Sequence, residues 1–440
     1  MGAESTRRAF LGATVPAALV GRHVLAEAGA KKPGPNDTIV TALIGCGGRG
    51  RWLMRDAFQK LPGVRFAGVC DVNRGPLVKA HKETDEKAKT YTDYRKLLED
   101  KSIDAVIVAT NGHWHVLPTI DACAAGKDVY VEKPLATSIG EGRAAVKAAR
   151  RYNRIVMIGT QQRSWQHYQQ AVEIIHSGLL GNISTVHVWD IENHYPGFGS
   201  PADCDPPPEL DWDFWVGPSP KVPYNPNRLK HHYWFYDYGG GWEHDWAVHH
   251  YDIVHWAMKV DAPIAAAATG SKFAFANDNR QWPDTFTGAC EYPPSPLAKQ
   301  GFLMSYNFRD GCKHPIEGRT HGKMFHGTDG TLVLDRKGFR IYSESRDGKH
   351  CIEKDKRTVV KKGSPENHAE VFLDCLRTRK RPDADVETGH YSSAPGLLMN
   401  IAYRVGRRIR WDPKAERVIG DPQANAMVTK KYRRPWTLPS

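Results

Sequence analysis

The chain lacks any apolar run long enough to cross a bilayer, and its cysteines lack the pattern of a disulfide framework. Eight cysteines are scattered through 440 residues, at positions 46, 70, 123, 204, 290, 312, 351 and 375. Internal repeats, low-complexity tracts, a helix-turn-helix and a stacked-aromatic signature are also missing. These absences argue against a stable membrane anchor, a disulfide-rich scaffold, a repeat protein and a nucleic-acid partner. We expect free, mostly buried thiols.

Acidic side chains are fewer than basic ones, 49 against 61, which gives a formal charge of +12. The basic residues are spread in short clusters, and solvated helix faces and a frayed C-terminal tail account for most of them. Attraction to acidic glycans or an anionic membrane surface stays open. The remaining composition, 40% hydrophobic and 25% charged, is that of a globular protein long enough for two domains.

The N-terminus has the pattern of a twin-arginine export signal. Thr6–Leu11 reads TRRAFL, a modest apolar segment follows it, and small residues suited to cleavage end at Ala30. The pattern predicts a signal peptide over residues 1–30, a flexible leader over 31–36 and a periplasmic or otherwise exported protein. An amphipathic N-terminal helix is the alternative.

Thr38–Gly50, TIVTALIGCGGRG, is a short apolar run that ends in glycines with the spacing G-x-G-x-x-G. In a strand–turn–helix setting, Gly45 makes the tight turn and Gly47 lets the backbone approach a pyrophosphate. Gly50 lets the helix, expected over Arg51–Leu61, pack close to the strand. The pattern predicts a dinucleotide site, although a glycine-rich turn alone is a weak signal.

A second expected strand, Val64–Cys70, ends at Asp71, about 20 residues beyond the glycines. A carboxylate at this place accepts hydrogen bonds from an adenosine ribose and repels a 2′-phosphate. The position therefore favours NAD, while Arg74 leaves NADP open. A solvated aspartate after a plain turn is the structural alternative.

Strand and helix patterns alternate from residue 37 to residue 160, which predicts a doubly wound parallel sheet with right-handed crossovers. Ligands bind at the carboxyl ends of the strands in such a sheet. Asp71, His115 and Lys133 all follow expected strands directly. Three polar landmarks at one edge favour a functional site there.

Beyond residue 160 the pattern becomes rich in strands, with a long proline-containing loop over Gly197–Arg228. We expect an α+β domain over residues 161–422, followed by a C-terminal tail over 423–440. Trp212, Phe214 and Trp215 are expected to pack the loop down.

Four motifs occur together: the glycine loop, Asn111 to His115, Glu132-Lys133-Pro134 and Asp245-x-x-x-His249. In this combination the chain resembles the glucose-fructose oxidoreductase, inositol dehydrogenase and MocA-like (Gfo/Idh/MocA) family over residues 37–422. The resemblance implies an α/β Rossmann domain followed by an α+β domain with a large open, mostly antiparallel sheet. Such sheets often form oligomer faces, so it also implies a homo-oligomer.

The resemblance assigns roles to individual residues. Those implied to bind the cofactor are Gly45, Gly47, Gly48, Arg49, Gly50, Asp71, Asn111, His115, Glu132 and Lys133. Lys133 is implied to lie beside the nicotinamide, where an ammonium can stabilise developing alkoxide charge. His249 suits a general base, and Asp245 would bind a sugar hydroxyl or orient that base. A surface lysine in a turn is the alternative for Lys133.

The segment around His249 departs from the usual family pattern, with Glu243 where an apolar residue is common and Ala247 where glycine is common. The density of acidic residues and histidines there, which includes His244 and His250, also raises a metal site, although the spacing matches none known to us. We predict no metal. A helix-capping aspartate among buried histidines is the structural alternative, and Asp252 could support His249.

Secondary candidates for substrate contacts are Gln161 and Arg163, after the last Rossmann strand, and Tyr236 and Asp237, before the glycines at 239–241. Hinge hydrogen bonds are the alternative for Gln161 and Arg163, and plain core packing is the alternative for Tyr236 and Asp237.

The sequence therefore predicts an exported NAD(P)-dependent oxidoreductase that acts on a sugar, cyclitol or glycoside with tightly bound cofactor. Two alternatives remain. An NAD-dependent glycosidase or epimerase would work by transient oxidation, elimination, hydration and re-reduction. A sugar-binding protein would keep the fold without turnover.

Overall fold

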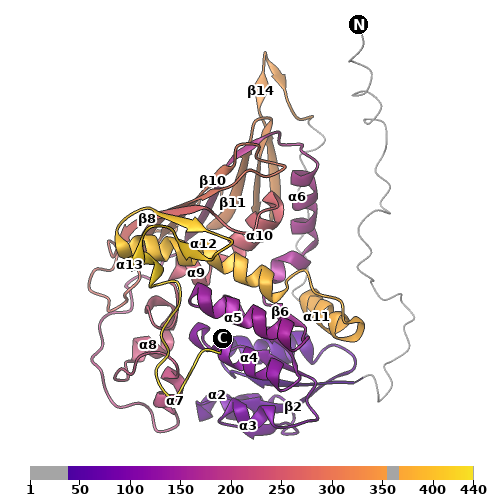
Figure 1. Cartoon of the computed structure of the whole chain (residues 1–440), viewed down its shortest axis with the longest axis vertical. Helices are drawn as coiled ribbons and strands as arrows, with labels where there is room; N and C mark the ends of the chain where they lie inside the picture. Colours follow the sequence, from indigo (N-terminus) through magenta and orange to yellow (C-terminus); the bar gives the residue numbers. More distant parts are fainter. Residues whose placement is uncertain (1–37, 354–365, 440) are drawn as a thin grey trace.

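The computed structural model describes residues 38–353 and 366–439, which form two packed domains (Figure 1). The twin-arginine segment and the leader lie outside the described residues. Within the described ranges, the longest apolar helices still fall short of what crossing a membrane requires.

The first domain is built on a six-stranded, fully parallel sheet with the order β3-β2-β1-β4-β5-β6. Its strands are β1 (Ile39–Ile44), β2 (Val64–Cys70), β3 (Lys89–Tyr91), β4 (Ala105–Val108), β5 (Asp128–Val131) and β6 (Val156–Ile158). The central strands β4 and β5 are buried along their whole length, as a sheet covered on both faces requires.

Helices cover both faces of this sheet. They are α1 (Gly48–Trp52), which continues as the π-helix η2 (Leu53–Phe58), α2 (Arg74–Lys82), α3 (Tyr94–Leu98), the 3₁₀ turn η3 (Gly112–Trp114), α4 (Val116–Ala124) and α5 (Ile139–Arg151). The first helix begins at Gly48, earlier than the predicted Arg51, because the glycine turn leads into it directly.

The second domain carries a nine-stranded sheet with the order β13-β12-β11-β7-β10-β9-β8-β16-β17. Its strands are β7 (Ile183–Ile191), β8 (Ala265–Ser271), β9 (Thr285–Tyr292), β10 (Phe302–Arg309), β11 (His321–Gly327), β12 (Gly330–Asp335), β13 (Gly338–Ser343), β16 (Ile409–Asp412) and β17 (Arg417–Val418). Only β7 and β10 pair in parallel, so the sheet is mostly antiparallel. The predicted fold class is confirmed.

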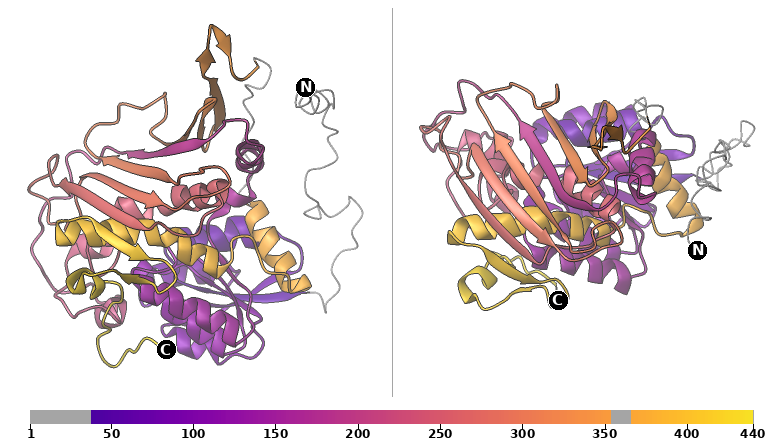
Figure 2. Two further views of the ribbon diagram at one scale, coloured as in Figure 1. Left: turned by 45° about the horizontal axis from the view of Figure 1, so that its top comes forward. Right: turned by 90° about the horizontal axis from the view of Figure 1, so that it is seen from above.

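One face of this sheet packs on helices that lie between it and the Rossmann domain, while the other face carries no helix of the described part (Figure 2). The covering helices are α6 (Gln166–His176), α10 (Val248–Met258) and α12 (Val386–Val405). Shorter elements are η4 (Gln161–Ser164), α7 (Trp212–Val216), α8 (Pro226–Lys230), η5 (His232–Trp234), α9 (Trp242–Asp245), α13 (Pro422–Asn425) and the hairpin β14 (Ser345–Arg346) and β15 (Lys349–His350).

The chain returns to the Rossmann domain after the second sheet. Helix α11 (Glu366–Thr378) packs Phe372 against Phe58 and Tyr130 under the first sheet. Asp385 forms a bridge to β6 through Met157. The two domains therefore share a core as well as a contact surface.

The C-terminal segment Lys430–Leu438 is ordered against both domains, so the expectation of a frayed tail is wrong. Lys430 Nζ donates to the carbonyls of Tyr236 and Asp237 at 3.1 and 3.3 Å. Tyr432 donates its hydroxyl to Glu141 on α5 at 2.7 Å. A basic segment becomes ordered here because carbonyls and a carboxylate accept its charged and polar groups.

Trp436, near the end of this segment, belongs to an aromatic cluster. Its ring lies 4.9 Å from Trp114 and stacks on Phe214 at 5.5 Å, with the Arg95 guanidinium 5.0 Å above it. Trp114 belongs to the Rossmann domain and Phe214 to α7, so this one side chain joins three parts of the chain.

Replacing Trp436 by alanine should lower the free energy of unfolding by about 1–2 kcal/mol, because the aromatic and cation–π contacts are lost. Circular dichroism should show a melting temperature lower by a few degrees. The exposed neighbour Lys431→Ala is the control and should leave the melting temperature unchanged. Equal melting temperatures for the two variants would contradict the prediction.

Candidate active site

The glycine turn between β1 and α1 has the geometry of a phosphate cradle. Gly45 has φ of +95°, and a Cβ there would lie 2.6 Å from the Ala109 and Thr110 backbone. A Cβ on Gly50 would lie 2.0 Å from the Gly45 oxygen, so only glycine lets this helix pack so closely. Nothing lies within 4 Å of the Cβ positions of Gly47 and Gly48, which face open space. The turn therefore fits a dinucleotide pyrophosphate at a helix N-terminus.

Asp71 lies at the end of β2, as the sequence predicts. Its Oδ2 accepts from Cys46 N at 2.7 Å and its Oδ1 accepts from Asn73 N at 2.8 Å. These two amides fix the carboxylate beside the glycine turn. Burial raises the pKa of Asp71. The arrangement suits a ribose diol, and Arg74 is exposed and does not line the cavity.

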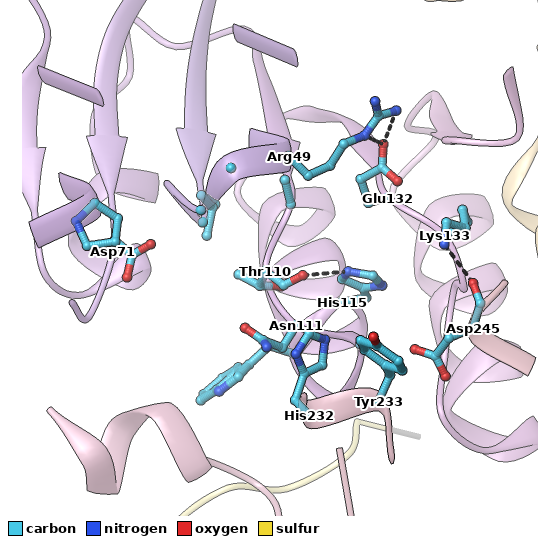
Figure 3. A pocket seen from close by; sticks show the side chains of 18 of the residues that line it. Arg49, Asp71, Thr110, Asn111, His115, Glu132, Lys133, His232, Tyr233 and Asp245 are labelled. Carbon is cyan, nitrogen blue, oxygen red and sulfur yellow. Dashed lines mark hydrogen bonds and ion pairs between the residues drawn. The ribbon is translucent and has the colours of Figure 1, made fainter. Parts of the chain in front are cut away.

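A cavity of about 690 Å³ runs from Asp71 to the junction of the two domains (Figure 3). The Rossmann domain lines it with Gly45, Gly47, Gly48, Arg49, Asp71, Asn111, His115, Glu132 and Lys133. The second domain contributes His232, Tyr233, Trp242, Asp245, Trp246, His249 and Arg336. With Gly50 behind the turn, the structure brings all the predicted cofactor and catalytic residues to one site.

Lys133 and Asp245 meet across the domain junction. Lys133 Nζ donates to the backbone carbonyl of Asp245 at 2.6 Å. The Asp245 carboxylate accepts from Gly240 N through Oδ2, also at 2.6 Å, while its Oδ1 has no hydrogen-bond partner in the described ranges. Burial lowers the pKa of Lys133 and raises the pKa of Asp245 to about 6.

His249 is 3% exposed, and its ring meets that of Trp246 edge to face at 5.6 Å. Burial, together with the charges of Lys133 and Arg336, holds the pKa of His249 well below its usual value. The imidazole is therefore neutral at physiological pH, which is the state that a general base requires. Its Nδ1 is buried without a hydrogen-bond partner among the residues described.

Two contacts set the cofactor side of the cavity. Arg49 Nε donates to Glu132 Oε1 at 2.8 Å, so these two charges largely compensate each other. The His115 ring lies between the carbonyls of Pro134 and Thr110, at 2.6 and 3.0 Å (Figure 3). His115 thereby ties the end of β4 to the turn that carries Lys133.

The spacing of four residues would place Asp245 and His249 on one face of a continuous helix. In the structure they lie on two helices, because α9 ends at Asp245 and α10 begins at Val248. The other polar residues of this segment point elsewhere. His244 contacts the Ala136 carbonyl at 2.9 Å, and His250 contacts Asp190 at 3.1 Å. Within the described ranges, His, Cys, Asp and Glu form no group of three that could hold a metal.

Three of the four secondary candidates, Arg163, Tyr236 and Asp237, lie outside the cavity lining. Arg163 binds both carboxylate oxygens of Asp252 at 2.9 and 2.8 Å, outside the cavity lining. Asp252 therefore supports Arg163 and, through Ser392, helix α12, rather than His249. The buried Asp252 carboxylate has its ion-pair partner in the Arg163 guanidinium, so it is not available to His249.

Tyr236 and Asp237 also lie outside the lining. Tyr236 packs edge to face on Trp282 at 4.4 Å, and the carbonyl of Asp237 accepts from Ser219 at 2.9 Å. Gln161 does line the cavity, and its Oε1 is buried without a partner among the described residues. It remains a candidate contact for substrate or cofactor.

Several lining residues were not predicted from the sequence. They are His232, Tyr233, Trp242, Trp246 and Arg336. The run of aromatic and histidine side chains from 231 to 236 is a signal that could have indicated the first two. Arg336 lies in a two-residue turn more than 80 residues from His249, and no local pattern marks it.

Both domains match models of one protein family. Residues 39–160 match its NAD-binding Rossmann fold, and residues 167–272 and 300–438 match its C-terminal alpha/beta domain. The chain belongs to the Gfo/Idh/MocA oxidoreductase family. NAD as cofactor, the main expectation from Asp71, is confirmed at the level of this family.

Relatives of this Gfo/Idh/MocA protein include inositol 2-dehydrogenase of Salmonella typhimurium, 31% identical over 151 residues. That alignment covers 34% of this chain and 45% of the relative, so the chain spans about half the length of the curated relatives it matches. The WlbA dehydrogenase of Bordetella pertussis, solved with NADH and UDP-GlcNAcA, has a TM-score of 0.62 at 21% identity. Aldose-aldose oxidoreductase of Caulobacter crescentus has a TM-score of 0.61 at 18% identity. Each structural match covers 85% of this chain and 99% of the other.

The raised pKa of Asp245 predicts that kcat/KM depends on pH. Since the Asp245 pKa is raised to about 6, kcat/KM should rise with pH through an apparent pKa near 6 as this carboxyl ionises. Burial and the charges of Lys133 and Arg336 hold the pKa of His249 well below its usual value, so we assign this limb to Asp245. Asp245→Asn should lower kcat/KM at pH 8 by about 100-fold and abolish the limb.

Asp237→Asn is the matched control, because Asp237 lies eight residues away and outside the cavity lining. It should keep both the rate and the pH profile. An unchanged acid limb in Asp245→Asn would assign the titration to another group.

Proposed function

We propose that the chain is an exported NAD-dependent oxidoreductase that transfers hydride between a carbinol carbon of a sugar, cyclitol or glycoside and a tightly bound nicotinamide cofactor. The observation that carries the proposal is the meeting of Lys133, Asp245 and neutral His249 at the end of a cavity whose other end holds the glycine turn and Asp71.

Each side chain has a role at the reacting hydroxyl. Lys133 Nζ, anchored on the Asp245 carbonyl, can donate a further hydrogen bond to the substrate oxygen and stabilise alkoxide character. His249 accepts the hydroxyl proton, and the free Oδ1 of Asp245 accepts from a neighbouring hydroxyl. NAD, when bound, supplies the hydride acceptor.

The proposed location rests on the twin-arginine pattern, and the proposed tight binding follows from it. A protein that folds before export carries its cofactor along, and free NAD is scarce outside the cytoplasm. We also propose that the open face of the nine-stranded sheet is a contact between copies of the chain. The names of the structural neighbours, which include an aldose-aldose oxidoreductase and a myo-inositol 2-dehydrogenase, support a polyhydroxylated substrate.

A trapped cofactor favours a second candidate reaction. If the cofactor cannot exchange, hydride must pass to a second substrate or return to the product of the first. A glycosidase or epimerase of the second kind would oxidise a carbinol of its substrate, eliminate a group, add water and then return the same hydride to the ketone, which restores NAD. It requires the same three side chains.

Lys133→Met and His249→Ala should each lower turnover by about 100-fold or more, because positioned acid–base groups contribute on that scale. Turnover is measured with a panel of sugars and glycosides, with products followed by mass spectrometry. Lys60→Met, an exposed lysine, and His350→Ala, an exposed histidine, are the controls and should retain full turnover. Near-normal turnover in either active-site variant would remove that residue from the mechanism.

Deuterium at the oxidised carbon separates the two reactions. Protein purified and dialysed without added NAD should be active in both cases. A label retained at the same carbon, with no ketone accumulating, shows the redox-neutral cycle, whereas a label on a second substrate shows net oxidation. Failure to retain any dinucleotide, together with a lack of turnover, would instead identify a sugar-binding protein.

A further inference from the structure

A guanidinium without a carboxylate partner lines the same cavity. Arg336 and Lys337 form the two-residue turn between β12 and β13. Asp335, before the turn, pairs with Arg319 and accepts from Lys337 N at 2.9 Å, which holds the turn in place. Arg336 is half-buried and lines the cavity, whereas Lys337 is exposed and does not.

The Arg336 side chain is fixed at one edge and free at the other. Its Cζ lies 4.5 Å from the centroid of the Trp246 ring. In the amide orientation that satisfies both ends of Gln162, Oε1 accepts from Arg336 Nε at 3.3 Å and the amide nitrogen donates to the His249 carbonyl at 3.2 Å. The two terminal nitrogens of Arg336 make no hydrogen bond or ion pair with any residue that the structure describes.

This free edge lies close to the reacting groups. The Trp246 ring that Arg336 covers also lies 5.7 Å from Lys133 Nζ and 5.6 Å from the His249 ring. A monosaccharide held at one hydroxyl by Lys133 and His249 can therefore present a ring substituent to Arg336. The cofactor's pyrophosphate, by contrast, belongs at the glycine turn after β1.

A partly desolvated charge without a partner is costly, and a ligand of opposite charge removes that cost. Burial also lowers the pKa of Arg336. The planar fork of a guanidinium matches the two oxygens of a carboxylate. Arg49, the other cavity arginine, already has Glu132, so it does not compete for such a group.

We propose that the substrate is a sugar acid, a uronic acid or its glycoside, whose carboxylate binds the terminal nitrogens of Arg336. The inference rests on the proposed function of the site and names its substrate class.

The test uses pairs of methyl glycosides that differ only at C6, glucuronide against glucoside and galacturonide against galactoside. Binding to the NAD-loaded protein is measured by calorimetry, and turnover is followed by mass spectrometry. In at least one pair we expect the acid to bind 10-fold or more tightly than the neutral sugar. Arg336→Gln should weaken binding of that acid by about 100-fold and change the neutral sugar by less than about 3-fold.

Lys337→Gln removes the adjacent charge outside the cavity and should leave the preference intact. The affinity for NAD should be the same in all three proteins, which shows that Arg336 acts on the substrate. A preference for the neutral sugar in every pair, or an acid preference that survives Arg336→Gln, overturns the proposal. A 6-sulfated glycoside that binds more tightly than the acid overturns the carboxylate assignment.

The outcomes separate this inference from the proposed function. Turnover of neutral sugars without an acid preference overturns the inference alone. Acid binding through Arg336 with no turnover of any sugar overturns the oxidoreductase proposal alone. If no sugar binds or reacts, both fail.

Discussion

The hydrogen bond from Lys133 Nζ to the Asp245 carbonyl joins the two domains at the point where the chemistry is proposed. Lys133 follows β5, and Asp245 ends α9, 112 residues later. Neither domain contains a complete site, because one supplies the glycine turn and the lysine and the other supplies the carboxylate and the histidine. The shared core through α11 and α12 and the C-terminal segment hold this junction together. Domain packing is therefore part of the active site.

Closure of the junction also sets the protonation states. Burial raises the pKa of Asp245 and lowers those of Lys133 and His249, so it disfavours the charged form of each group. Near neutrality this leaves a neutral His249 imidazole beside Lys133 and an ionised Asp245 carboxylate. Such a set can accept a proton at one atom and stabilise negative charge at another.

Local patterns predicted most of the first domain and the identity of its key residues. The glycine turn, Asp71 and Lys133 each follow a strand whose length and burial are evident from the sequence. The alanine-rich strand β8 was missed, because its composition resembles a helix and only its neighbours β9 and β16 define it. The ordered C-terminal segment was also not predicted, because the groups that accept its hydrogen bonds lie far away in the sequence.

The substrate end of the cavity was the least predictable part, and its assembly explains why. Arg336, Trp246 and Tyr233 come from a strand turn, a helix junction and the 3₁₀ turn η5, which lie far apart in the sequence and meet only in the folded chain. Arg163 shows the converse: its sequence position left both a cavity contact and a hinge hydrogen bond open, and the buried Asp252 binds it outside the cavity lining. A charged side chain in such a junction is placed by the partner that neutralises it. Of the two arginines that line the cavity, Arg336 is the one that the described residues leave without a carboxylate, and for this reason its charge points to the substrate rather than to the fold.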